Sequence, residues 1–282
     1  MIDETVEEIR EMQTHSSSVV AVKAARALEE LLGREFATVE EYQRDLERNS
    51  NALQRANPSH ASLHTTQREI VSAVADADPE TVAAAKAATE EAIETVVEQV
   101  ESAKHLAAEH AATHLSDGET LLTHDYSSTV LEAIELAAAR GDAFTVYVTE
   151  ARPRHLGRKA ARELAGVDGV DVHLVVDSAS GLVLRECDRA VVGMDCIVDG
   201  TLYNRVGTFP IAAAADAVGV PFTVVGSSSK VIEEGGFVFE NEYRSPSEVM
   251  REPAEGFQID NPAYDATPTD LVDHVVTDED AA

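Results

Sequence analysis

The stretch that decides the fold is Thr120-Leu121-Leu122-Thr123-His124-Asp125-Tyr126-Ser127-Ser128-Thr129. Its short apolar run, polar turn and following helical pattern near 129–140 are typical of a buried strand that leads into a covering helix. The same order repeats downstream. Predicted strands lie at 144–148, 170–176, 189–192, 222–225 and 237–240, and predicted helical segments lie at 156–164, 180–186 and 208–217. This alternation predicts an α/β fold with a Rossmann-like parallel sheet covered by helices.

The residues before this region have apolar side chains at helical spacing, most clearly in a stripe over 93–107. Such a stripe is typical of a helix with one buried face. Asp78-Pro79 suits the start of this helix, because the first turn of a helix tolerates proline. We therefore predict an N-terminal helical domain over 1–117 and an α/β domain over 118–282.

The composition excludes several classes of function. The chain carries 22 Lys and Arg against 52 Asp and Glu, a formal net charge of −30, which repels nucleic-acid backbones and anionic membranes. No apolar run reaches the roughly 20 residues needed to cross a bilayer. We therefore expect a cytoplasmic protein with no direct nucleic-acid partner and no membrane partner. The acidic surplus and scarce lysine favour a halophilic, high-salt cytosol, although a merely acidic mesophilic protein is the alternative.

Polar side chains follow each of the first five predicted strands, at 124–129, 150–154, 177–179, 193–195 and 226–230. Ligands of open α/β sheets bind outside the carboxyl ends of the strands, so we expect these loops to converge on one rim. Carboxylates, basic side chains and hydroxyls on this rim favour a small phosphorylated ligand that is rich in hydroxyl groups. The alternative is that each loop residue only caps a helix or faces solvent.

Two further expectations concern charge on this rim. A helix is predicted to begin at Gly207-Thr208, and helix N-termini favour anions such as phosphate. Glu150 is expected to orient Arg152 through an ion pair. The sequence has no Gly-rich dinucleotide fingerprint or Walker-type phosphate loop, and its histidines lack ligand spacing, so we predict neither a cofactor nor a metal.

Four stretches resemble a known family. They are 122–130, 148–157, 192–208 and Asn261-Pro262-Ala263-Tyr264-Asp265-Ala266-Thr267-Pro268, of which the last is similar to the family segment NPxFDxTP. The chain resembles the alpha/beta/delta family of translation initiation factor 2B, which includes ribose 1,5-bisphosphate isomerases and methylthioribose-1-phosphate isomerases. The resemblance implies a helical N-terminal domain, a Rossmann-like C-terminal domain, and a homodimer or higher homo-oligomer.

The resemblance also implies site residues. The isomerases use an Asp and a Cys on opposite sides of the rearranged sugar carbon; the Asp corresponds to Asp195, and Asp125 stands where the Cys is expected. The predicted substrate-binding residues are Ser127, Ser128, Thr129, Arg152, Asn204, Arg205 and Lys230. Arg152 is included because of its place on the rim, and the other six correspond to family positions.

Departures from the family pattern affect charge. Arg205 replaces the lysine of an Asn-Lys pair, Asn57-Pro58 replaces Arg-Pro, and His15-Ser16-Ser17-Ser18 replaces a loop of the Arg-Gly-Ala type. Replacement of the thiol by Asp125 places a second carboxylate against Asp195, and two such groups repel unless they share a proton.

Two functions remain open at this stage. The first is a regulatory or sensing family member that binds a sugar phosphate or nucleoside monophosphate. The second is a ribose 1,5-bisphosphate isomerase, an aldose–ketose isomerase in which Asp125 and Asp195 exchange a proton through an enediol. The lost charge at Asn57 and near Ser16 weakens binding of two phosphates, so the sequence favours the first function.

Overall fold

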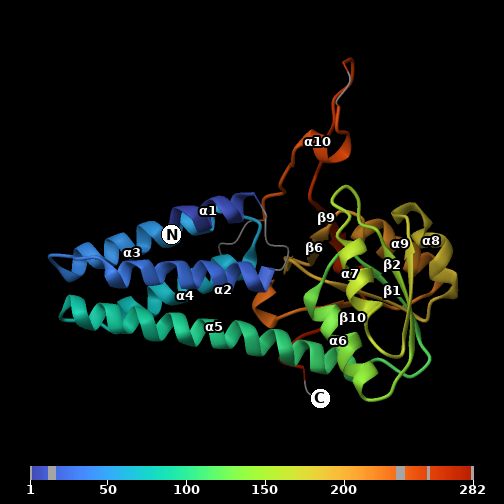
Figure 1. Cartoon of the computed structure of the whole chain (residues 1–282), viewed down its shortest axis with the longest axis horizontal. Coiled ribbons are helices and arrows are strands. Elements are labelled where there is room, and N and C mark those ends of the chain that lie inside the picture. Colours follow the sequence, from blue (N-terminus) through green and yellow to red (C-terminus); the bar gives the residue numbers. More distant parts are fainter. Residues whose placement is uncertain (1, 12–16, 233–238, 253–254, 281–282) are drawn as a thin grey trace. The chain divides into compact units, whose positions relative to one another are not determined.

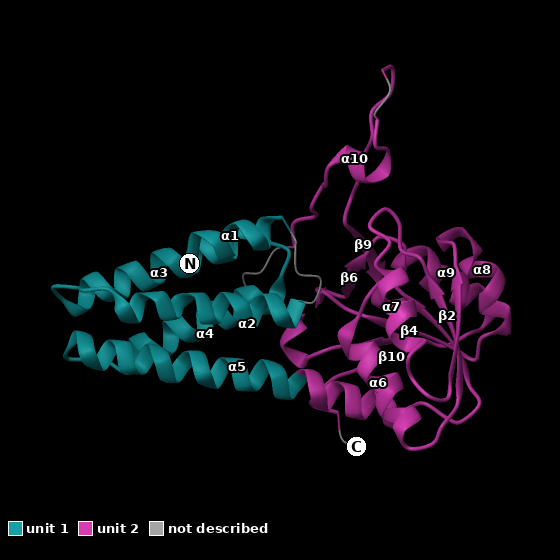
Figure 2. Ribbon diagram, in the orientation of Figure 1, with its two compact units in different colours: residues 1–103 teal, residues 104–282 magenta. Residues whose placement is uncertain are grey.

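The computed structural model describes residues 2–11, 17–232, 239–252 and 255–280. It divides into two compact units, Met1–Ala103 and Lys104–Ala282 (Figure 2). The boundary falls inside α5 (Val82–Thr113), so one continuous helix contributes residues to both units.

Unit 1 is built from helices whose apolar faces share one core. They are α1 (Ile2–Arg10), α2 (Ser17–Ala27), α3 (Val39–Ala56), α4 (Ala61–Asp76) and the first part of α5, with a 3₁₀ turn at Leu28–Gly33. Tyr42, Leu46 and Leu53 recur at helical spacing on α3 and are buried. The Tyr42 hydroxyl lies 2.7 Å from the Thr89 hydroxyl on α5, which satisfies a polar group inside this core.

The apolar stripe predicted over 93–107 lies on α5, and Ile93, Val96 and Val97 are buried in the core of unit 1. Ser16, in the loop singled out for its lost charge, lies outside the described residues. Asn57 precedes α4, and its side-chain oxygen accepts a hydrogen bond from the Ser59 backbone at 3.2 Å. Asn57 therefore stabilises a turn at the helix start.

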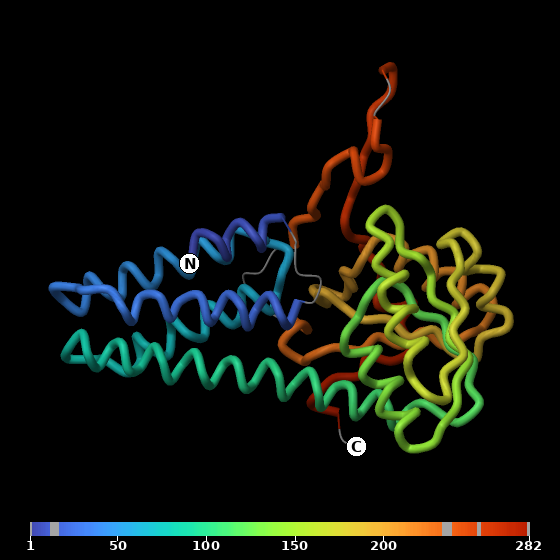
Figure 3. Tube along the Cα trace, in the orientation of Figure 1, coloured from blue at the N-terminus to red at the C-terminus, as the bar shows by residue number. Residues whose placement is uncertain are grey.

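Unit 2 contains the predicted parallel sheet. Its strands are β1 (Thr120–His124), β2 (Phe144–Thr149), β3 (Val170–Val175), β4 (Arg189–Gly193), β7 (Phe222–Val225) and β10 (His274–Val276). The order is β10-β7-β4-β1-β2-β3, and every neighbouring pair is parallel. The predicted fold class is confirmed. The sequence analysis missed β10, which in the trace of Figure 3 is the red C-terminal segment returning to the sheet.

Helices cover both faces of this sheet (Figure 1). The helices are α6 (Ser128–Ala139), α7 (Gly157–Leu164), α8 (Ser180–Val183) and α9 (Thr208–Val218), with 3₁₀ turns at Asp177–Ala179 and Leu184–Glu186. One apolar cluster joins α6, α7 and the end of α5 to the sheet, and a second joins α9 to the sheet. Because both faces are covered, the central strands are buried along nearly their whole length, as their apolar sequences predict.

A second, smaller sheet lies beside the first in the fold of unit 2. It has the order β8-β5-β6-β9, formed by Val231–Ile232, Cys196–Val198, Thr201–Arg205 and Tyr264–Pro268. The turn predicted at Asp199-Gly200 joins β5 to β6, and both residues have positive φ angles. The sequence analysis did not predict this sheet. Of the strand predicted at 237–240, residues 237 and 238 lie outside the described residues, and residues 239 and 240 form no strand.

The remaining short elements of unit 2 are α10 (Pro246–Val249) and 3₁₀ turns at Ser228–Lys230 and Thr269–Leu271. Within the part of the chain that the structure describes, no helix combines the length and apolarity needed to cross a membrane.

Gly157 allows α7 to begin directly against the end of β2. A Cβ atom on this residue would overlap the Thr149 carbonyl group, which is backbone and cannot rotate away. We expect Gly157→Ala to lower the free energy of unfolding by about 1–3 kcal/mol or more, the usual cost of overpacking. Urea unfolding measures the change. Gly181→Ala is the matched control in the same unit, because its Cβ would meet only the Ala214 side chain at 3.7 Å; equal stability of the two variants would contradict this packing argument.

Candidate functional site

The candidate site lies where the carboxyl ends of the parallel strands meet the end of β6. A pocket of about 330 Å³, part of which is open to solvent, occurs there in unit 2. Its charged and amide-bearing lining residues are Asp125, Arg152, Arg154, Arg205, Arg244, Glu248 and Asn261. Four guanidinium groups against two carboxylates make this a locally basic site in a chain of net charge −30.

Asp125 follows β1 directly and has a φ angle of 63°, a left-handed conformation that aspartate adopts more readily than most residues. Its carboxylate Oδ2 lies 3.3 Å from Nε of Arg205, and only about a tenth of either side chain is exposed. Burial raises the pKa of the Asp125 carboxyl; Arg205 and His124 oppose the rise, and Asp195 adds to it. The net pKa is raised, so this carboxyl holds a proton more readily than an ordinary aspartate.

Arg205 ends β6 and lies opposite Tyr264 of β9 in the sheet register. Its guanidinium carbon is 4.9 Å from the centre of the Tyr264 ring, a cation–π distance. Burial opposes the positive charge, but the negative charges nearby, including Asp195 and Asp125, outweigh burial and raise the pKa of Arg205. The guanidinium therefore stays charged inside the site.

Asp195 lies close enough to this ion pair to affect both of its members, and Lys230 lies close to Asp195; neither is among the described residues that line the pocket. Both are buried, and Lys230 Nζ donates a hydrogen bond to the Met194 carbonyl at 2.9 Å. Burial lowers the pKa of Lys230, while Asp195 opposes the fall. In this structure Lys230 thus faces the end of β4.

The predicted hydroxyl loop has clear local roles at the start of α6. Ser127 is the N-cap, and its hydroxyl accepts from the Val130 backbone at 3.3 Å. The Ser127 side chain also packs against Gly193, where a Cβ would come within 2.5 Å of Ser127 Oγ. Ser128 is half-buried and Thr129 is buried on the first turn of the helix. These three residues border the Asp125 loop without lining the pocket.

The expectation that the N-terminus of α9 binds phosphate is wrong for this structure. The Asp265 carboxylate already accepts hydrogen bonds from the Gly207 and Phe209 backbones at 2.6 and 3.1 Å. A carboxylate on the positive end of the helix dipole takes the place that a phosphate would need. Asn204 lies next to it and donates to the Thr208 hydroxyl at 3.0 Å, so its amide also supports this helix start.

The loop after β2 is held by acids other than those expected. The backbone N–H groups of Ala151 and Arg152 both donate to the Asp177 carboxylate at 2.7 Å. Glu150 pairs with Arg158 at 2.5 Å instead of with Arg152, so the predicted ion pair is wrong. The reason is that α7 starts immediately after the loop and brings Arg158 back toward Glu150.

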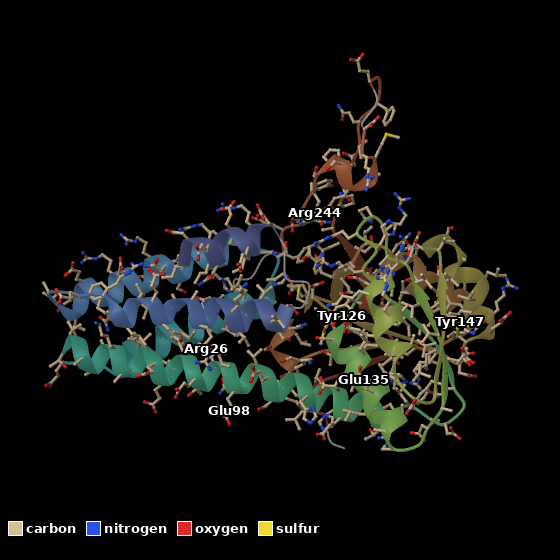
Figure 4. All side chains as sticks on the ribbon, in the orientation of Figure 1. Arg26, Glu98, Tyr126, Glu135, Tyr147 and Arg244 are labelled. Carbon is tan, nitrogen blue, oxygen red and sulfur yellow. The ribbon has the colours of Figure 1, made fainter. Side chains whose placement is uncertain are left out.

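The sequence analysis missed Arg244 and Glu248, which complete the pocket from the C-terminal segment. Arg244, labelled in Figure 4 on the segment leading into α10, pairs with Glu242 at 2.8 Å and Glu248 at 2.9 Å. The Asn261 side-chain amide donates to Glu248 Oε2 at 3.2 Å. No sequence pattern signals this contribution, because the segment has no predicted element and reaches the pocket only through the tertiary fold.

Among the described residues, no group of three His, Cys, Asp or Glu side chains is arranged to hold a metal ion. Cys196, next to Asp195 in sequence, is buried on β5, and burial raises the pKa of its thiol. Its chemistry is therefore that of an inert core thiol.

The structure defines the class of the protein: a helical unit is joined to an α/β unit that has a basic pocket at the rim of its parallel sheet. Comparison with known proteins identifies its family. The model of the initiation factor 2 subunit family, IF-2B, matches residues 13–281. Ribose 1,5-bisphosphate isomerase of Methanocaldococcus jannaschii is 32% identical over 99% of this chain and 90% of that protein. The protein of the same name from Haloterrigena turkmenica is 31% identical over 97% of this chain and 88% of its own length.

A solved structure gives the same answer. The crystal structure of translation initiation factor eIF-2B from Pyrococcus horikoshii OT3 matches with a TM-score of 0.83 and 27% identity, and the match covers 98% of this chain and 94% of that one. The chain belongs to the initiation factor 2 subunit family.

The raised pKa of Asp125 predicts an unusual dependence of stability on pH. The folded state binds this proton more tightly than the unfolded chain, so stability contributed by the protonated carboxyl is lost as pH rises above about 4. We expect the free energy of unfolding of wild type to fall relative to that of Asp125→Asn between pH 4 and 7. The variant leaves Arg205 without its ion-pair partner, but the guanidinium stays charged in this range, so this loss changes the difference between the two proteins by a constant amount. Denaturant unfolding at each pH measures the difference.

Glu150→Gln is the control of opposite sign. Arg158 lowers the pKa of Glu150, so the folded state binds that proton less tightly, and wild type should gain stability relative to this variant as pH rises from about 3 to 5. The electrostatic description of Asp125 would be contradicted if the free energy of unfolding of wild type also increased with pH relative to that of Asp125→Asn.

Proposed function

We propose that the protein binds a phosphorylated sugar in the Asp125–Arg205 pocket and interconverts its aldose and ketose forms, with ribose 1,5-bisphosphate as the first substrate to test. The curated relatives that span nearly the whole chain bear the name of this isomerase. They favour the enzymatic alternative over the regulatory role that the sequence analysis placed first. The observation that carries the proposal is a buried Asp125, with a carboxyl pKa that burial raises, at the wall of an arginine-lined pocket.

The chemistry requires an acid and a base in one site. In ribose 1,5-bisphosphate the anomeric oxygen carries a phosphate, so the ring bond between C1 and the ring oxygen must break as a base removes the proton from C2 and an acid protonates the ring oxygen. The resulting C1–C2 enol phosphate becomes the ketose when its hydroxyl gives up a proton and C1 takes one, with no net gain or loss of atoms or electrons. Two carboxyl groups perform this exchange when one is protonated and the other ionised. Burial raises the pKa of the Asp125 carboxyl, and Asp195 adds to the rise against Arg205 and His124, so Asp125 is suited to hold the proton that it donates. In this proposal Asp125 supplies the proton and Asp195 removes one.

The arginines supply the attraction for phosphate. The chain as a whole repels anions, so a polyanionic substrate needs a local excess of positive charge. Burial lowers the pKa of Arg154, and the positive charges of Arg244 and Arg205 lower it further. A bound phosphate would relieve this crowding of like charges. Arg152 extends the same wall, with its guanidinium 3.2 Å from the Val249 carbonyl.

A second candidate function is binding of the sugar phosphate without turnover, as a regulatory family member. The favouring observation is the ion pair itself. Arg205 lies 3.3 Å from the Asp125 carboxylate, and this ion pair favours the ionised form of the carboxyl, which opposes the proton donation that turnover requires. Turnover and binding therefore need separate measurements.

The catalytic proposal predicts that the protein forms a ketose from ribose 1,5-bisphosphate. Asp125→Asn and Asp195→Asn should each reduce turnover by about 100-fold or more, the usual contribution of general acid–base catalysis. Asp171→Asn, an exposed carboxylate on β3 of the same sheet, is the control and should retain activity. Wild-type binding without ketose formation would support the second candidate, and absence of binding would exclude both.

The phosphate proposal predicts a loss of affinity in Arg154→Gln. A charge-assisted hydrogen bond contributes roughly 1.5–3 kcal/mol, so the dissociation constant for ribose 1,5-bisphosphate should rise by about 10- to 100-fold. Arg162→Gln changes an exposed arginine on α7 whose guanidinium contacts the Arg158 carbonyl, and it serves as the matched control. Isothermal titration calorimetry distinguishes the variants; equal affinity for both would remove Arg154 from the phosphate site.

A further inference from the structure

Tyr264 lies close to the charged groups of Asp125, Asp195 and Arg205. It is the first residue of β9, its side chain is 2% exposed, and it faces Arg205 across the β6–β9 pair. Its ring carries the Arg205 guanidinium at 4.9 Å. The hydroxyl is close enough to Asp195 and Asp125 for both carboxylates to affect its pKa.

The ring is fixed in position by its neighbours. Phe239 meets it edge-on, with ring centres 5.4 Å apart at 88°, and Phe239 in turn stacks on Tyr203 at 3.9 Å. The Asn241 side chain donates to the Tyr264 carbonyl at 2.9 Å and accepts from the Tyr264 N–H at 3.3 Å. The ring is therefore packed against Phe239, and its backbone is held by Asn241.

The Tyr264 hydroxyl is buried and has no hydrogen-bond partner among the described residues. A buried hydroxyl without a partner destabilises a fold, and a phenylalanine ring would fill the same space without that cost. Burial raises the pKa of Tyr264, and Asp195 raises it further against the effect of Arg205. At neutral pH the group is a protonated donor held beside two carboxyl groups and a guanidinium.

We propose that Tyr264 is a specificity-determining residue whose hydroxyl donates a hydrogen bond to an oxygen of the bound sugar phosphate. The inference rests on the proposed function, since the ligand is the one that occupies the Asp125–Arg205 pocket. Arg205 both lines this pocket and lies over the Tyr264 ring. Tyr264 does not line the pocket in this structure, so the proposal requires that a bound anion draws the Arg205 guanidinium away from the ring and lets the ligand reach the hydroxyl.

The test is Tyr264→Phe, which removes the hydroxyl and keeps the ring. We expect the dissociation constant for ribose 1,5-bisphosphate, measured by calorimetry, to rise about tenfold, while the thermal midpoint of the ligand-free protein stays the same or rises. If the Tyr264 hydroxyl instead made a hydrogen bond inside the fold, Tyr264→Phe would lower the thermal midpoint and leave the dissociation constant unchanged. Tyr203→Phe removes a hydroxyl from the same aromatic cluster outside the pocket and should leave affinity unchanged.

The outcomes separate this inference from the proposed function. If wild type binds the bisphosphate and Tyr264→Phe binds it equally well, the role of Tyr264 is overturned and the proposed function stands. A ligand-free Tyr264→Phe protein that is less stable than wild type also overturns it, because the hydroxyl then has a partner in the fold. If wild type does not bind ribose 1,5-bisphosphate, both proposals fail.

Discussion

The site depends on the junction between the end of β1 and the end of β6, where His124 and Asp125 contact Val206 and Arg205. Asp125 pairs with Arg205, and His124 Nε2 lies 3.0 Å from the Val206 carbonyl. A carbonyl can only accept, so that ring nitrogen carries a proton. The next residue, Gly207, leaves room for the imidazole, since a Cβ there would lie 2.6 Å from His124 Cε1. The junction joins the large sheet to the small one and places the buried charges between them.

This arrangement explains how an acidic chain can hold an anion site. The net charge of −30 belongs to the whole chain, whereas the pocket contains four arginines whose own acids are few and individually paired. Glu248 is paired with Arg244, and Asp125 is paired with Arg205. Both carboxylates are therefore committed to one arginine each, and Arg152 and Arg154 add two further positive charges to the lining. The local arrangement of side chains thus makes the pocket positively charged, although the composition makes the whole chain negative.

Several rim residues that the sequence marks as functional have structural partners in this fold. Ser127 caps α6, Asn204 supports the start of α9, and Lys230 donates to the Met194 carbonyl. Capping and ligand binding use the same hydroxyl, amide and ammonium groups, so residue type alone cannot separate the two roles. Their contribution to the ligand stays a prediction. The distinction matters most for Lys230, which is buried beside Asp195 and away from the pocket lining.

The sequence by itself determined the alternation of β1, β2, β3, β4 and β7 with helices, because apolar periodicity and strand-end polar residues are local signals. It also placed Asp125 and Arg152 at one rim, since parallel strands put all their carboxyl ends at the same edge; Arg205 was expected in the site from the family resemblance, and it ends β6 of the small sheet. Only the tertiary structure decided the small sheet and the pairing of β10, which join residues far apart in the chain. The same holds for Arg244 and Tyr264: their roles come from burial and from partners that the chain brings together by folding, and no local pattern encodes those distances.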